Sequence, residues 1–170
     1  MESRTKVFGH PVHPMLVMFP VGLLSTAVIF DIIHLVTGNP VLATVSFYMI
    51  AAGVAGGLLA AIFGFIDWLA LPTSRAKSIG GWRGLGNVVV TGLFAVSWLL
   101  RAGNVNFVPD GLALLLSFGG IALALVTAWI GGELVYRLGV GVDPGANVNA
   151  PNSLTEPSAT STRTKRTANR

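Results

Sequence analysis

The chain has 170 residues, of which 52% are hydrophobic and only 11% are charged. This composition is too apolar and too poor in charge for an ordinary soluble domain, and it favours one membrane domain. Cysteine is absent, which excludes a disulfide framework, a thiolate metal site and a thiol nucleophile. The net charge of +4 comes from basic residues at the ends of apolar runs and in the tail, so anionic lipid rather than nucleic acid is the expected charged partner.

The first apolar run is predicted to form a membrane-spanning helix over residues 14–36. In the preceding His-Pro-Val-His-Pro segment, Pro11 and Pro14 disfavour the helical conformation at His10 and His13. We therefore expect an extended segment until Pro14 opens the helix as its first residue. The run is too long for a signal peptide and no small-residue cleavage site follows it, so we expect it to remain in the mature protein.

Three further runs, over residues 41–66, 84–100 and 111–136, avoid charge for roughly the 20 residues that cross a bilayer. Between the first two helices, the Thr-Gly-Asn-Pro sequence of residues 37–40 predicts a tight antiparallel turn. The sequence therefore predicts an all-α membrane protein, with four transmembrane helices in an up-down bundle over residues 1–142. Small residues that permit close helix contact occur in the second and fourth runs: Gly53, Gly56, Gly57, Ala60, Gly64, Gly120, Ala124, Ala128 and Gly132.

The positions of lysine and arginine predict the orientation of this bundle, because short loops rich in these residues stay in the cytoplasm. All of the 11 lysine and arginine residues except Arg101 fall on one side of the predicted spans. We therefore expect a multi-pass protein of a bacterial inner membrane with both termini in the cytoplasm. Residues 143–170 are rich in Asn, Pro, Ser and Thr and are expected to form a disordered, basic cytoplasmic tail that attracts anionic lipid.

Polar residues near the spans fall into two layers at this predicted topology. Near the outer side, Asp31 and His34 share one helical face and have Arg101 at a similar depth, which predicts a structural clamp between the first and third spans. A second polar layer is predicted at the cytoplasmic face and is the candidate binding site: His10, His13, Asp67, Arg83 and Glu133. Glu133 and Arg137 are also spaced as an ordinary i,i+4 ion pair at a helix end.

The histidines do not form a metal site in the predicted geometry. An extended segment advances about 3.1 Å per residue, which places His10 and His13 about 9 Å apart, too far for one zinc ion unless the segment folds into a turn. A haem held by two histidines of one subunit is also disfavoured, because His34 lies some 30 Å along the helix from His13. The sequence contains no Ser/His/Asp arrangement, phosphate loop or HExxH motif.

Four segments together resemble a known family: GHPVHPMLVMFPVGLL with the following FD, AGVAGGLLAAIFGFIDW, GWRGLGN and WIGGELVYRLGVGV. They are similar to the bacterial membrane proteins catalogued as domain of unknown function 2231, over about Phe8 to Val142. The resemblance implies a four-helix inner-membrane domain with no assigned activity. Relatives joined to a Rieske-type iron–sulfur domain suggest electron transfer. Relatives often carry a histidine where this chain has Arg83, and that departure removes a natural haem partner for His10 or His13.

Two classes of function remain open at this point. The first is a non-enzymatic membrane module that binds a partner protein, a lipid or a small ligand through the candidate layer. The second is an accessory to a membrane electron-transfer chain that holds haem or contacts quinone near His10 and His13. The sequence leaves open whether copies of the chain associate, which ligand is bound and which redox or other membrane protein is the partner.

Overall fold

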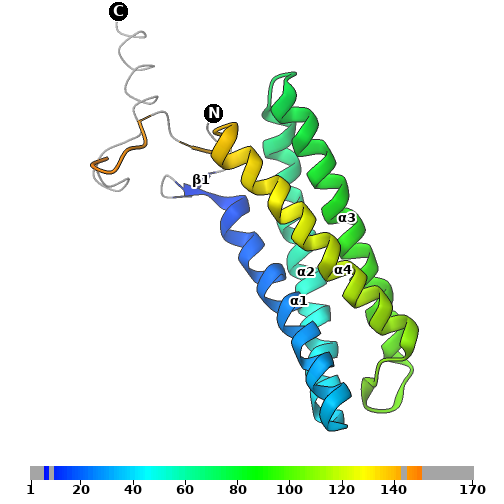
Figure 1. The fold of residues 1–170 in the computed structure, drawn as a ribbon. Coiled ribbons are helices and arrows are strands. Elements are labelled where there is room, and N and C mark those ends of the chain that lie inside the picture. The colour runs from blue at the N-terminus through cyan, green and yellow to red at the C-terminus, as the bar shows by residue number, and fades with distance from the viewer. Residues whose placement is uncertain (1–5, 8–9, 143–144, 151–170) are drawn as a thin grey trace, which may run out of the picture.

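A computed structural model describes residues 6–7, 10–142 and 145–150, and it confirms the predicted all-α membrane fold. The four long helices are α1 (Val12–Thr37), α2 (Pro40–Ala70), α3 (Arg75–Ala102) and α4 (Gly111–Gly132). They run up and down in a bundle (Figure 1). A short π-helix, η2 (Glu133–Arg137), continues α4, and a 3-10 turn, η1 (Val105–Phe107), lies between α3 and α4. All four spans are long and apolar enough to cross a membrane.

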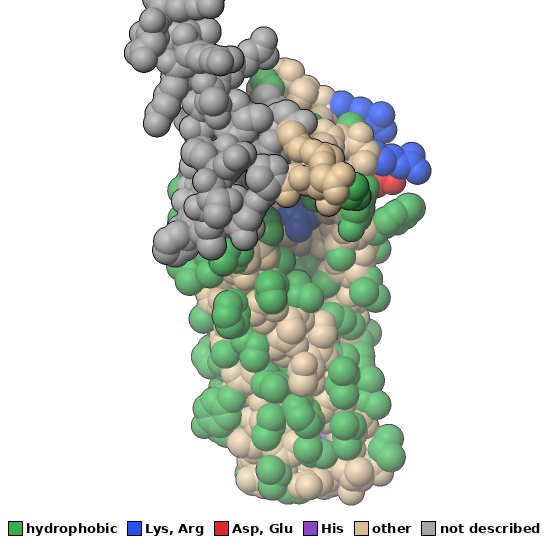
Figure 2. Space-filling view, turned by 90° about the vertical axis from the view of Figure 1, so that its left-hand side faces the viewer, with side chains coloured by type: hydrophobic (Ala, Val, Ile, Leu, Met, Phe, Trp, Pro, Cys, Tyr) green, Lys and Arg blue, Asp and Glu red, His purple; other side chains and the backbone are tan. Residues whose placement is uncertain are grey.

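The two ends of the bundle differ, and we name them after their places in Figure 1. The upper end holds the start of α1, the connection between α2 and α3, and η2. The lower end holds the α1–α2 turn and the connection that contains η1. Hydrophobic side chains cover most of the flank seen in Figure 2, and Lys and Arg side chains gather near its upper end. This distribution suits a bundle surrounded by lipid along its length.

The chain reaches α1 through two short strands, β1 (Lys6–Val7) and β2 (His10–Pro11), which pair antiparallel. The extended conformation predicted for His10 is thus confirmed. The predicted helix start at Pro14 is wrong, because α1 begins at Val12 and includes His13 in its first turn. Proline is tolerated there because the N–H groups of the first turn have no intrahelical acceptor.

The turn between α1 and α2 has the predicted position and chemistry. Gly38 takes a positive φ of 68° that favours glycine, and its N–H donates to the His34 carbonyl at 2.8 Å. The Asn39 side chain then caps α2 by accepting from the Val41 N–H at 3.0 Å. Pro40 starts α2, as the sequence predicts.

The third helix starts nearer to the second than the apolar run indicates. It begins at Arg75 rather than residue 84, and Ser74 caps it by accepting from the Lys77 N–H at 3.3 Å. Counting apolar residues finds only the part of a helix inside hydrocarbon, whereas the first turns of α3 are polar and belong to the interface. Arg75 and Lys77 therefore lie on a helix and not in a loop.

Glycines allow the helices to approach closely, as predicted. A Cβ atom on Gly53 would lie 2.6 Å from the Leu24 side chain, and one on Gly120 would lie 2.8 Å from Phe94. The buried core lies around these contacts and consists of Leu24, Ala27, Val28, Ile50, Val90 and Phe94. Close backbone approach is what drives helix association in lipid, where apolar burial gains little. The predicted tail is described only at residues 145–150, and its other residues lie outside the described part of the chain.

Candidate functional site

The lower half of the bundle holds a fully buried ion pair between α1 and α3. Arg101 donates to both carboxylate oxygens of Asp31, each at 2.7 Å, and both residues have no exposed surface. Ser46 of α2 and Ser117 of α4 accept from the same guanidinium at 3.2 and 3.0 Å, and Ser97 accepts from its Nε at 3.3 Å. Side chains from all four helices thus meet at this pair, which we call the Arg101 clamp.

Every donor of the Arg101 clamp is used. A guanidinium has five N–H groups. Arg101 donates one hydrogen bond from Nε and two from each terminal nitrogen. The predicted pairing of Asp31 with Arg101 is confirmed. His34 does not take part in the clamp as predicted, because its Nδ1 forms a hydrogen bond with the Asn39 carbonyl at 2.8 Å in the α1–α2 turn. Since no polar group of the clamp is left over, its role is structural.

The upper end holds a different polar cluster, centred on His13. The His13 Nδ1 donates to the Ala60 carbonyl of α2 at 2.9 Å. Because a carbonyl only accepts, Nδ1 carries the hydrogen and Nε2 keeps a lone pair in the neutral ring. The ring lies against Gly64, where a Cβ would come within 2.7 Å of its Cε1. Gly64 therefore makes room for the imidazole.

Arg83 of α3 extends across α4 at the same end. A Cβ on Gly131 would lie 2.7 Å from the Arg83 Nε, so this side chain also depends on a glycine. The Nε is buried and has no hydrogen-bond partner among the described residues. Arg83 and Asp67 are both close enough to His13 to act on it electrostatically, with opposite signs.

The structure therefore brings together three of the five predicted site residues. His13, Asp67 and Arg83 come from α1, α2 and α3 and lie near one another at the upper end, and we call them the Arg83 cluster. Glu133 forms the predicted ion pair with Arg137 at 3.3 Å, with both side chains exposed to solvent in part. His10 lies in β2, three residues before His13.

The donor set of this cluster does not resemble a common metal or haem site. Among the residues that the structure describes, no three His, Cys, Asp or Glu side chains gather in a way that would hold a metal ion. A haem with two histidine ligands would need a second imidazole facing His13, and His34 lies at the other end of α1. The cluster offers instead one guanidinium, one imidazole and one carboxylate, which is a set suited to hydrogen bonding.

Sequence reasoning missed two parts of these arrangements. The serines of the Arg101 clamp were not predicted, because serine is common in membrane helices and no spacing marks these three. Gly64 was predicted as a packing glycine and Gly131 was not singled out, although each lies against a polar side chain.

Comparison with known proteins agrees with this architecture. No curated protein and no solved structure matches the chain. The family described as predicted membrane protein, domain of unknown function 2231, matches residues 9–144, which include all four helices and both polar clusters. The chain therefore belongs to this family of predicted membrane proteins.

Proposed function

We propose that the chain is a non-enzymatic membrane module that binds a small anionic group, a phosphate or a carboxylate, at the Arg83 cluster. The observation that carries this proposal is the buried Nε of Arg83, which has no partner among the described residues. A buried donor without an acceptor costs about 1–3 kcal/mol, and more when it is charged. An acidic oxygen placed at this guanidinium would remove that cost.

The contrast between Arg101 and Arg83 supports this assignment. Arg101 has an acceptor for each of its N–H groups, as a structural arginine should. The Nε of Arg83, in contrast, has no acceptor within the described part of the chain. The planar fork of a guanidinium matches the two oxygens of a carboxylate or phosphate, and such pairs are among the stronger hydrogen bonds in proteins.

His13 and Asp67 complete the proposed site in distinct ways. The Nδ1 of His13 is held by Ala60, so its Nε2 is the ring atom that remains for a ligand. It accepts a hydrogen bond when neutral and donates one when protonated. Asp67 contributes a carboxylate near the ring.

The electron-transfer alternative receives less support from this geometry. A haem held by His13 would use a ring whose Nδ1 is already hydrogen-bonded to Ala60. A quinone carbonyl would fit the donors of Arg83 but would leave the charge of the guanidinium uncompensated. An absorption spectrum of the purified protein tests the haem alternative, because a bound haem has visible bands and a phosphate or carboxylate does not.

The test is a thermal melt of the detergent-purified protein with defined anions. Inorganic phosphate and succinate test soluble ligands at constant ionic strength, and mixed micelles with phosphatidylglycerol test a lipid headgroup. We expect one of these probes to raise the Tm of the wild type and to have no such effect on Arg83→Gln. Arg137→Gln is the matched control, since Arg137 is an exposed arginine at the same end.

Three results would count against the proposal. Arg83→Gln could respond to the probe as the wild type does, in which case the anion binds elsewhere. The wild type could respond to none of the probes. A visible absorption band that disappears in His13→Ala would transfer support to the electron-transfer alternative.

We also propose that the upper end faces the cytoplasm of a bacterial cell. The described basic residues at that end include Arg75, Lys77, Arg83 and Arg137, and the lower end has Arg101 alone. Under this orientation the Arg83 cluster would be open to soluble cytoplasmic anions as well as to lipid headgroups.

A further inference from the structure

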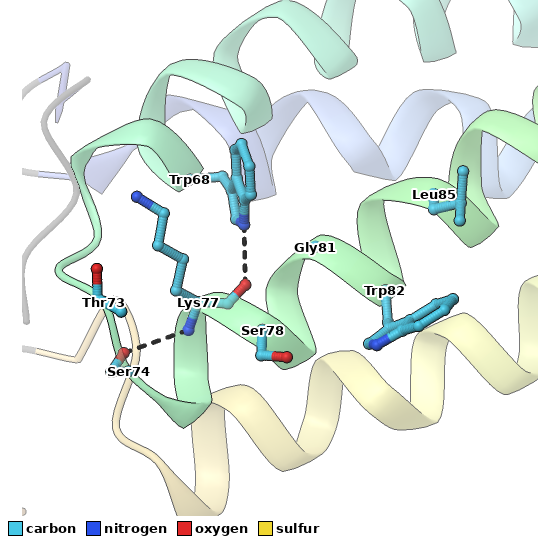
Figure 3. Close-up of a pocket in the computed structure, with 8 residues that line it drawn as sticks. All are labelled: Trp68, Thr73, Ser74, Lys77, Ser78, Gly81, Trp82 and Leu85. Carbon is cyan, nitrogen blue, oxygen red and sulfur yellow. Dashed lines mark hydrogen bonds between the residues drawn. The ribbon is translucent and has the colours of Figure 1, made fainter.

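The upper end also carries an open groove that is separate from the Arg83 cluster. It has a volume of about 450 Å³ and lies where α2 ends and α3 begins. Its lining residues, drawn in Figure 3, are Trp68, Thr73, Ser74, Lys77, Ser78, Gly81, Trp82 and Leu85. None of them belongs to the Arg83 cluster or to the Arg101 clamp.

The groove is held in shape by contacts among its own residues. The indole Nε1 of Trp68 donates to the Lys77 carbonyl at 2.9 Å, which joins the end of α2 to the first turn of α3. The Lys77 ammonium lies 5.3 Å from the centre of the Trp68 ring and donates to the Leu71 carbonyl at 2.9 Å. Gly80 and Gly81 leave space for the Trp68 ring, since a Cβ on either would touch it.

The chemistry of the lining changes along α3. The hydroxyl side chains Thr73 and Ser74 and the cation Lys77 lie at the start of the helix, and Trp82 and Leu85 lie further along it (Figure 3). Eleven residues separate Ser74 from Leu85 in the sequence, which is about 16 Å along a helix axis. The groove thus runs from a polar end at the upper surface to an apolar end nearer to the middle of the bundle.

We propose that this groove binds one anionic phospholipid, with its phosphate at Lys77 and the neighbouring hydroxyls and an acyl chain along Trp82 and Leu85. The direction of the polarity matches a lipid whose headgroup is at the membrane surface and whose tail runs inward. Lys77 uses one of its three N–H donors on Leu71, so two remain for phosphate oxygens. No acidic residue occurs in the first turn of α3 to oppose the negative charge.

The exposure of the apolar residues fits a lipid chain as the occupant. Trp82 and Leu85 are 69% and 54% exposed, so neither is committed to the core of the bundle. Tryptophan is enriched at membrane interfaces because its ring packs on acyl chains while its N–H remains near water. This proposal does not depend on the function proposed for Arg83.

Native mass spectrometry of the protein released from nanodiscs tests the inference. Nanodiscs contain equal parts of phosphatidylglycerol and phosphatidylcholine. We expect the wild type to retain phosphatidylglycerol preferentially. Lys77→Gln should reduce the retained fraction about fivefold, the effect of one lysine near an anionic surface. Trp82→Ser should reduce the retention of both lipids, because it removes the surface against which the chain packs.

Two controls separate this site from other lipid contacts. Trp129→Ser removes another exposed tryptophan, 66% exposed on α4, and should leave retention unchanged. Arg137→Gln, at an exposed arginine of the same end that belongs to neither site, should also leave it unchanged. The groove variants leave Arg83 intact, so a failure here is distinct from a failure of the Arg83 proposal. Lys77→Gln also removes the bond to Leu71, and Trp82→Ser tests the groove independently of that loss.

The proposal is overturned by any of three outcomes. The wild type could retain the two lipids equally, or both groove variants could retain as much phosphatidylglycerol as the wild type. Alternatively, the wild type could emerge as a dimer that Trp82→Ser converts to a monomer, which would make a second copy of the chain the occupant of the groove.

Discussion

At the scale of single residues, Arg101 and Arg83 differ in how many of their N–H groups have a hydrogen-bond acceptor, and the binding role proposed for Arg83 rests on this difference. Arg101 is enclosed by acceptors from all four helices, so exchange of a ligand at this position would break existing bonds. Arg83 has a buried Nε that lacks an acceptor among the described residues and is placed by a glycine on the opposite helix.

The Arg101 clamp predicts a large loss of stability on removal of one charge. Asp31→Asn should lower the Tm in detergent more than any variant of the Arg83 cluster, because it leaves a buried guanidinium without a counterion, at a cost of about 3–5 kcal/mol. His13→Ala should cost about 1 kcal/mol, the bond to Ala60. Thermal melts of the two variants provide the comparison.

A double variant serves as the control for that prediction. Asp31→Leu combined with Arg101→Met removes both charges and should melt above either single variant, because no unpaired charge remains. If the double variant is less stable than both singles, the clamp contributes through something other than charge compensation.

The glycines beside the polar side chains provide a second prediction at this scale. Gly131→Ala would place a Cβ 2.7 Å from the Arg83 Nε and should displace the guanidinium, with loss of the anion-dependent rise in Tm. Gly119→Ala is the matched control on the same helix, because a Cβ there meets nothing within 4 Å. Both variants should insert and fold, and the difference between them should lie in the response to the anion. An unchanged response in Gly131→Ala would contradict the proposed position of the ligand.

At the scale of the elements, the sequence predicts what depends on hydropathy and local turn chemistry. The positions of the four spans and the Gly38–Asn39 turn follow from charge-free runs and from residues with known turn preferences. The start of α3 cannot be predicted from hydropathy, because the first turns of this helix are polar and only the Ser74 cap marks them. The pairing of Asp31 with Arg101 was predictable because few other charges lie at that depth. The hydrogen-bond partner of His34 could not be predicted from the sequence, because it is a backbone carbonyl.

The connection between α3 and α4 shows how an element outside the spans is fixed by packing. Asn106 and Phe107 have φ values of 54° and 55°, which are unfavourable for residues with side chains. The Phe107 ring stacks on Phe47 of α2 with centroids 4.0 Å apart, and the Thr44 hydroxyl donates to the Asn106 carbonyl at 3.1 Å. These contacts with α2 compensate for the strained backbone.

This arrangement predicts the effect of removing the ring. Phe107→Ala should increase amide hydrogen exchange over residues 103–110, because the strained conformation loses the stacking that holds it. Val105→Ala, at a side chain that is 83% exposed in the same turn, should leave exchange unchanged. Equal exchange in the two variants would show that the ring contact does not hold the connection.

At the scale of the whole molecule, charge and burial together determine the expected orientation. Arg101 is the only basic residue on its side of the spans in the sequence, and it would oppose the positive-inside rule if it lay free at the surface. The structure places it inside the bundle with its charge paired to Asp31. The lower end therefore presents none of the chain's lysine or arginine to the lipid headgroups among the described residues, and the asymmetry between the ends is sharper than the sequence alone indicates.

This asymmetry predicts a topology that reporter fusions can test. A fluorescent protein fused after Arg170 should fold and fluoresce in the cytoplasm, and alkaline phosphatase fused at the same position should be inactive. Alkaline phosphatase inserted in the α3–α4 connection, after Asn104, should be active because that connection would face outward. The variant Arg101→Gln should keep the same reporter pattern, since the buried arginine does not contribute to the charge difference between the surfaces. An active phosphatase after Arg170 would reverse the orientation, and it would place the Arg83 cluster and the proposed lipid groove on the outer face of the membrane.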